Sequence, residues 1–228
     1  MIKKVKLLGI SIDNYTVREA MLQVDVFLSN EQLNIIETIT TKLLVKAEEI
    51  PVVKSCIEQS DLAVIGEKGV LTAAGVKTAQ RIKETREHEF LKEFMKRVVR
   101  NHKSVYLLGE KKDSVQAFQE FLTQKYGIAS VVGSYAMEEC VGDEDAVINE
   151  MNAAVPDVIL SILPVPKQEQ LLMTHKDKLN ANIWYSIGEE YAKTLQAGGV
   201  KRGLMYMIHN KHLRWKNNKY EEEQGKSI

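Results

Sequence analysis

The hydrophobic residues of this chain follow two alternating periods. Short runs rich in β-branched and aliphatic residues alternate with longer stretches in which apolar residues return every three or four positions. The first pattern predicts buried β-strands, and the second predicts amphipathic helices with one buried face. We therefore expect strands at residues 5–10, 33–39, 62–65, 104–108, 129–132, 158–163 and 183–187.

Several of the intervening stretches carry the helical pattern clearly. In the first of them, Val17, Met21 and Val24 fall on one face. In the last, Gly127 follows directly and is a typical C-terminal stop. We expect helices at residues 16–28, 85–99 and 114–126.

Strands and helices that alternate at this spacing form a mostly parallel sheet with helices on both faces. Right-handed crossovers favour a doubly wound, Rossmann-like α/β topology. We expect one domain over residues 1–200, with a soft internal boundary near residue 102. Residues 201–228 are expected to form a basic, helical C-terminal appendage that ends in an acidic tail.

Composition narrows the class of protein. Lys and Arg together number 31, as do Asp and Glu, and this zero net charge argues against a nucleic-acid or other general polyanion binder. Cys56 and Cys140 lie far apart and form no metal-binding motif, which indicates a reducing compartment. No apolar run approaches the roughly 20 residues of a membrane-spanning helix. We expect a cytoplasmic protein, at most peripheral at the inner face of the cell membrane.

Ligands of open parallel sheets bind beyond the carboxyl ends of the strands. One such turn begins at Gly109, where the start of the next helix offers free N–H groups to a phosphate, although the same residues could simply cap that helix. A second turn, Pro166-Lys167-Gln168-Glu169, opens the helix after the strand at 158–163. A third contains Gly188, and the two acids after it suit a helix N-terminus without any function.

The second turn resembles the G-x-P-K-Q-E motif of the WecG/TagA/CpsF family, glycosyltransferase family 26. The resemblance extends over roughly residues 5–195, and PKQE is its most specific part. In the same order, residues 8–13 resemble the family's opening strand, 60–64 its "ADLV" strand, 106–109 its "FLLGG" segment, 155–160 the strand before PKQE, and 187–188 its "GVGGAFD" turn.

This resemblance implies transfer of an N-acetylhexosamine from a UDP-sugar to a polyprenyl-diphosphate-linked acceptor, in the synthesis of cell-surface polysaccharides. It implies a Rossmann-like fold, no metal and no cofactor, with homo-oligomerisation left open. The residues that it implicates in binding the donor and its diphosphate are Arg81, Thr85, Gly109, Lys167, Gln168, Glu169 and Gly188. It implicates Thr38 near the acceptor hydroxyl, and Glu67 is our candidate for the base.

At the position of the base this sequence departs from the family. The family has "PDGxG" after the ADLV strand, and its Asp is the proposed base. Here the run is Ile65-Gly66-Glu67, so Gly66 falls on the Asp position. Glu67 could replace that Asp only if the loop shifts, because the base must reach hydrogen-bond distance of the acceptor.

Other family motifs are also altered. "NTVNAQ" becomes residues 37–42, which keep Thr38 but lose the Asn, and "RVAGTDL" becomes residues 81–86, which keep Arg81 and Thr85. Pro164 replaces the Gly before PKQE and removes one N–H. Glu189 replaces a Gly of "GVGGAFD". These changes favour an alternative, a non-catalytic homologue that binds a nucleotide-sugar or a partner enzyme as a regulator or scaffold.

The C-terminal appendage carries a second candidate surface. Between Ala192 and Tyr220 the chain has seven Lys or Arg residues and no acidic one. A basic helix with Trp on its apolar face can lie on an anionic membrane, or it can dock on the core with its basic face in water. His209 and His212 lack a third ligand for a metal. The residues expected to contact the membrane or the acceptor are Lys211, Arg214, Trp215 and Lys216.

Overall fold

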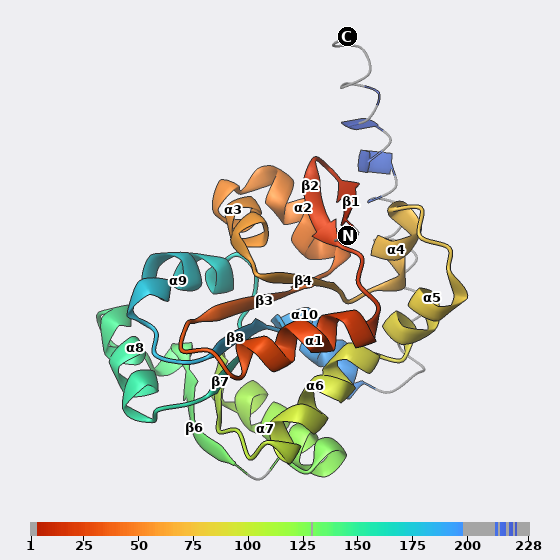
Figure 1. Ribbon diagram of the computed structural model, residues 1–228. Coiled ribbons are helices and arrows are strands. Elements are labelled where there is room, and N and C mark those ends of the chain that lie inside the picture. Colours follow the sequence, from red (N-terminus) through yellow and green to blue (C-terminus); the bar gives the residue numbers. More distant parts are fainter. Residues whose placement is uncertain are drawn as a thin grey trace.

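The computed structural model describes residues 4–128 and 130–197, together with Leu213, Trp215, Lys216, Asn217, Lys219, Tyr220 and Glu222 of the C-terminal segment. Its centre is a six-stranded sheet in which every neighbouring pair of strands is parallel (Figure 1). The strands, in spatial order, are β4 (Leu62–Ile65), β3 (Asn34–Ile39), β8 (Ile183–Ser186), β7 (Val158–Ile162), β5 (Val105–Gly109) and β6 (Val131–Ala136).

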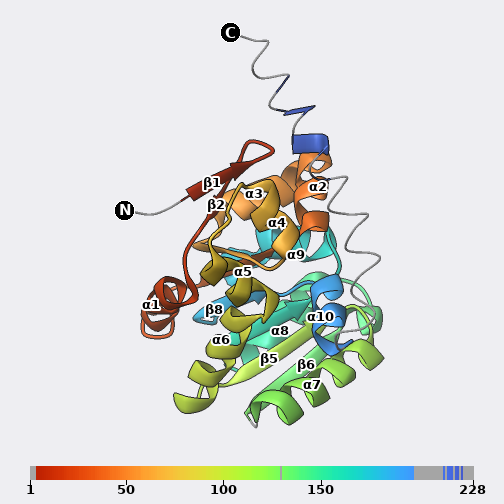
Figure 2. The same ribbon diagram turned by 90° about the vertical axis from the view of Figure 1, so that its right-hand side faces the viewer.

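Helices cover both faces of the sheet, as the alternating pattern predicts. The Rossmann-like α/β prediction is therefore confirmed. One face carries α1 (Val17–Phe27), α6 (Glu89–Arg100), α7 (Lys112–Tyr126) and α10 (Glu189–Gln196), and α10 lies beside α7 (Figure 2). The other carries α3 (Pro51–Gln59), α8 (Glu144–Ala153) and α9 (Lys167–His175).

The helix signals in the sequence act as expected at α1 and α7. Thr16 caps α1 in a capping box, since its side chain accepts from the Glu19 N–H while the Glu19 carboxylate accepts from the Thr16 N–H at 2.8 Å. Gly127 ends α7 in the left-handed region, with φ at 69°. The capping box fixes the start of α1 and the glycine fixes the end of α7, boundaries that the hydrophobic stripe alone would leave approximate.

Two expectations are corrected by the structure. The helix expected at 85–99 is two helices, α5 (Ala79–Arg86) and α6, separated at His88, whose φ of 53° is left-handed. The strand expected at 5–10 is a hairpin of β1 (Lys4–Leu7) and β2 (Ile10–Asp13) outside the main sheet. The chain reverses at Leu8 and Gly9, both at positive φ, where glycine is favoured.

The hairpin, α2 (Thr41–Glu49) and the short α4 (Lys68–Ala73) pack around an apolar cluster that is separate from the clusters under the helices on the two faces of the sheet. Described residues of the C-terminal segment close this cluster. Leu213 is fully buried, and the side-chain oxygen of Asn217 accepts the Leu8 N–H at 3.2 Å. Lys216 pairs with Glu48 of α2 at 2.6 Å, whereas Trp215 is 59% exposed. This part of the segment therefore docks on the core while Trp215 faces outward. Lys211 and Arg214 lie outside the described residues.

At two points the helices that follow neighbouring strands lie on opposite faces of the sheet. Between β5 and β7, α7 departs on one face and α9 on the other. Between β3 and β8, α3 and α10 likewise lie on opposite faces. Such points of divergence are where open parallel sheets bind ligands. No helix within the described part of the chain is long and apolar enough to cross a membrane.

Candidate active site

Two clefts border the carboxyl end of β3, and their empty volumes of about 460 Å³ and 360 Å³ include space that is open to solvent. Thr38, at the end of β3, and Tyr191, in the first turn of α10, line both clefts. The clefts are therefore adjacent compartments of one candidate site. We call the cleft that β4 lines the β4 cleft, and the one that Gln168 and Glu169 line the PKQE cleft.

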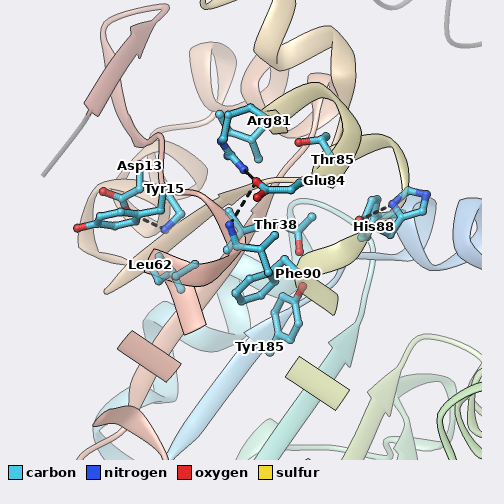
Figure 3. Close-up of a pocket in the computed structure, with 16 residues that line it drawn as sticks. Asp13, Tyr15, Thr38, Leu62, Arg81, Glu84, Thr85, His88, Phe90 and Tyr185 are labelled. Atoms are coloured by element: carbon cyan, nitrogen blue, oxygen red, sulfur yellow. Dashed lines mark hydrogen bonds and ion pairs between the residues drawn. The ribbon is translucent and has the colours of Figure 1, made fainter. Parts of the chain in front are cut away.

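The β4 cleft contains Arg81 and Thr85, as the resemblance implies, but the charge of Arg81 is already neutralised (Figure 3). Its guanidinium pairs with the Glu84 carboxylate at 2.8 Å, and both side chains are about nine-tenths buried. Its Nε donates to Asn14 at 3.2 Å, and Glu84 also accepts the Val17 N–H at the start of α1. Arg81 is thus built into the wall of the cleft.

On the opposite wall of the β4 cleft, His88 and Tyr191 join α10 to the break between α5 and α6. Nδ1 of His88 lies 2.7 Å from the Tyr191 hydroxyl, and the two rings meet edge to face. Sequence reasoning missed both residues. The sequence feature that could have identified this contact is Tyr191, an aromatic residue just after the turn at Gly188.

The PKQE cleft is lined by Gln168 and Glu169 from the first turn of α9 and by Gly188, whose positive φ of 77° starts α10. Gln168 and Glu169 are almost fully buried. Within the described residues, Oε1 of Gln168 and Oε2 of Glu169 have no hydrogen-bond partner. Buried polar atoms are nearly always paired, so these two oxygens are candidates to accept a hydrogen bond from a ligand in the cleft.

A buried glutamate that the sequence reasoning did not single out lies in the same cleft. Glu37 of β3 is 1% exposed, and its carboxylate accepts a hydrogen bond from the Cys56 thiol at 3.7 Å. Burial raises its pKa well above the ordinary value, and the negative charge of Glu169 raises it further, against hydrogen bonds from Ser186 and Cys56. The available signal was an acid inside a strand of otherwise apolar character.

Burial also raises the pKa of Glu169, to about 7, although its own backbone N–H and the Gln168 amide act in the opposite direction. Near the cleft mouth, Lys42 pairs with Glu190 at 3.2 Å, and Glu189 also lines the cleft. The PKQE cleft therefore carries more acidic than basic side chains. Such a lining suits sugar hydroxyl and amide groups better than a bare diphosphate.

Glu67, the candidate base, points elsewhere. Its carboxylate accepts the Thr41 N–H at 3.1 Å, at the start of α2, and it is not among the residues that line either cleft. The neighbouring Gly66 packs tightly, because a Cβ there would lie 2.6 Å from Cγ2 of Thr38 and 3.3 Å from the Tyr191 ring. Thr38 and Tyr191 thus fill the space that a side chain at position 66 would need.

The turn at Gly109 is also occupied by the chain itself. A Cβ on Gly109 would lie 2.6 Å from a methyl group of Val115, so the glycine permits close packing of α7 on β5. The Lys112 N–H at the start of α7 donates to the Glu138 carboxylate at 2.7 Å. Lys167 pairs with Glu110 at 2.6 Å and is half exposed. Lys167 and Gly109 therefore lie beside the two clefts rather than in their lining.

The structure thus brings Thr38, Gln168, Glu169 and Gly188 into one cleft and Thr38, Arg81 and Thr85 into the next. Across residues 4–128 and 130–197 and the described tail positions, no group of three or more His, Cys, Asp or Glu side chains is placed to hold a metal ion.

Comparison with known proteins identifies the family of this chain. A relative from Staphylococcus aureus (strain NCTC 8325 / PS 47), named N-acetylglucosaminyldiphosphoundecaprenol N-acetyl-beta-D-mannosaminyltransferase, is 26% identical over 93% of this chain and 82% of its own length. The protein of the same name from strain MRSA252 is 25% identical over the same shares. Residues 5–208 match the sequence profile described as the glycosyl transferase WecG/TagA/CpsF family, and the chain belongs to that family.

Proposed function

We propose that this chain is a glycosyltransferase that moves an N-acetylhexosamine from a UDP-sugar to a polyprenyl-diphosphate-linked acceptor. The family and the name of the Staphylococcus relatives support a glycosyl transfer of this type. The observation that carries the proposal is the PKQE cleft, where buried polar atoms of Gln168 and Glu169 have no partner among the described residues. A sugar with several hydroxyls and an acetamide would satisfy such atoms.

The charge distribution favours one orientation of the donor. The floor of the PKQE cleft is acidic, whereas its mouth carries Lys42, and Lys167 lies nearby at the start of α9. The sugar ring would occupy the floor, and the diphosphate would lie toward these two lysines. On binding, Lys42 would release Glu190 and Lys167 would release Glu110, and both would pair with the diphosphate. Helix N–H groups at the starts of α9 and α10 would support the diphosphate.

Isothermal titration calorimetry with UDP and UDP-N-acetylhexosamines tests donor binding, and UDP release with a soluble polyprenyl-diphosphate acceptor analogue tests transfer. We expect binding of a UDP-N-acetylhexosamine and release that requires the acceptor. Gln168→Ala should weaken donor binding at least tenfold. Gln170→Ala, on the exposed side of the same helix, is the matched control.

The outcomes separate the competing readings. Binding without acceptor-dependent release would support the non-catalytic homologue instead. Absence of binding to every nucleotide tested would contradict the proposal as a whole.

A further inference from the structure

Glu37 and Glu169 form a buried acidic pair beneath the PKQE cleft. The two residues come from different elements, β3 and the first turn of α9, and both line the cleft. They are 1% and 0% exposed. Among the described basic side chains, none forms an ion pair with either carboxylate. Two acids placed in this way cannot both be ionised without a large cost.

The surroundings assign different roles to the two acids. Glu37 is held from behind by the Cys56 thiol of α3 and by Ser186 of β8, whose Oγ in turn accepts the Trp184 indole N–H at 3.0 Å. Glu169 uses one oxygen to accept from Gln168 at 3.3 Å and leaves Oε2 without a partner in the described chain. Glu37 is therefore fixed in the floor, and Glu169 has an oxygen available to a ligand.

We infer that Glu169 is the general base of the transfer reaction and that Glu37 is the positioning residue that keeps the pair at a single negative charge. This inference rests on the proposed function. It also provides the base that the family places at an Asp where this chain has Gly66. Glu67 is less suited, because its carboxylate caps α2 instead of lining a cleft.

The step balances with the substrates already proposed. The acceptor hydroxyl oxygen forms a bond to the anomeric carbon of the donor sugar, and the bond from that carbon to the diphosphate oxygen breaks. UDP leaves with the bonding electron pair, and the hydroxyl proton passes to Oε2 of Glu169. The pair then holds two protons and returns one to water once product leaves.

Several charged or titratable groups face the pair and could affect its titration. Cys56 approaches from α3, Lys42 from α2, and Glu189 and Glu190 from α10. Lys176, after α9, acts on Cys56. Because Lys42 is paired with Glu190, it leaves the buried pair without a cation of its own. A base with a pKa near neutral is well matched to proton transfer at neutral pH.

The test compares Glu169→Gln, Glu37→Gln and a control, Glu120→Gln, on the exposed side of α7. We expect Glu169→Gln to lower kcat/KM by roughly 10²–10⁴-fold, a larger loss than the weakening of donor binding that calorimetry measures, because Gln keeps a hydrogen-bonding group beside the sugar. The acid limb of its pH–rate profile, near pH 7, should disappear. Glu37→Gln should retain this limb with a smaller loss of kcat/KM, and Glu120→Gln should match the unmodified protein.

A readout independent of turnover separates this inference from the proposed function. Carbon-13 NMR of glutamate-carboxyl-labelled protein should show one carboxyl that titrates near pH 7, present in Glu120→Gln and absent in Glu169→Gln. Glu169→Gln with full activity, or no carboxyl titrating near neutrality, overturns the base assignment while leaving the proposed function in place. If instead the titration is seen but the unmodified protein releases no UDP, the proposed function fails and the base assignment fails with it.

Discussion

Gly66 and Thr38 are packed so closely that a Cβ on the glycine would stand 2.6 Å from Cγ2 of the threonine. Gly66 directly follows β4, and Thr38 is the second-to-last residue of the neighbouring strand β3 and lines both clefts. A side chain at position 66, where the resemblance implies an Asp, would therefore have to displace Thr38.

This contact predicts a specific dependence between the two positions. Gly66→Ala should destabilise the protein by about 1–3 kcal/mol, since its methyl group would overpack the wall. In a Thr38→Ser background, which removes the blocking Cγ2, the same change should cost clearly less. Urea denaturation of the two single variants and the double variant measures the coupling. Equal costs of Gly66→Ala in both backgrounds would show that Thr38 does not close the site.

The Arg81–Glu84 pair predicts a large effect on stability. Both side chains are more than 90% buried, and they are 2.8 Å apart. Glu84→Gln leaves the Arg81 charge without its counterion, which should cost about 3–5 kcal/mol. The exposed pair of Lys96 and Glu93 supplies the control, because Glu93→Gln should change the free energy of unfolding by less than about 1 kcal/mol. A small effect of Glu84→Gln would mean that solvent or another anion reaches Arg81.

Much of the scaffold can be predicted from the sequence. The buried stripe of a helix such as α1 and the continuous apolar run of a strand such as β7 are both visible as sequence patterns. The hairpin was missed because the apolar run at 5–10 looks the same whether or not the chain reverses within it. The break at His88 was missed because the hydrophobic period continues across it.

The candidate site was only partly predictable. The PKQE motif located Gln168 and Glu169, since a strand followed by Pro and a helix start is a local signal. Glu37 and Tyr191 lie far from that motif in the sequence. They line the clefts only because β3 pairs with β8 and α10 packs on the sheet. The i,i+3 spacing of Arg81 and Glu84 on α5 is itself a signal for their ion pair, but the burial of that pair depends on the packing of α5 against the rest of the fold.

The pKa of Glu169 predicts how stability varies with pH. Its folded-state value is raised from 4.5 to about 7, so between these values the folded protein binds a proton that the unfolded chain has lost. The stability that this proton confers is present at pH 4 and is lost as the pH rises through 7. The full contribution of this proton to the free energy of unfolding is on the order of 3 kcal/mol.

Glu169→Gln stays uncharged at every pH and should therefore escape that loss. The free energy of unfolding of this variant, relative to the unmodified protein, should rise by about that amount between pH 5 and pH 8. Urea titrations at both values measure it, and Glu120→Gln should show no such change. A constant difference between Glu169→Gln and the unmodified protein would mean that Glu169 is ionised throughout this range.

The C-terminal segment predicts separate effects for its buried and exposed residues. Leu213→Ala should destabilise the protein by about 2–5 kcal/mol, because the side chain is fully buried in the cluster beneath the hairpin. Trp215→Ala should leave stability nearly unchanged but weaken sedimentation with anionic vesicles, if this exposed ring inserts at a membrane surface. Unchanged vesicle binding by Trp215→Ala would remove Trp215 from the proposed membrane contact.

The most direct test of the account is UDP release by the unmodified protein, measured with a UDP-N-acetylhexosamine in the presence and absence of a soluble polyprenyl-diphosphate acceptor analogue. We predict release that depends on the acceptor and falls by at least a hundredfold in Glu169→Gln. Donor binding without any acceptor-dependent release would contradict the account, and the chain would then be a nucleotide-sugar-binding homologue without transferase activity.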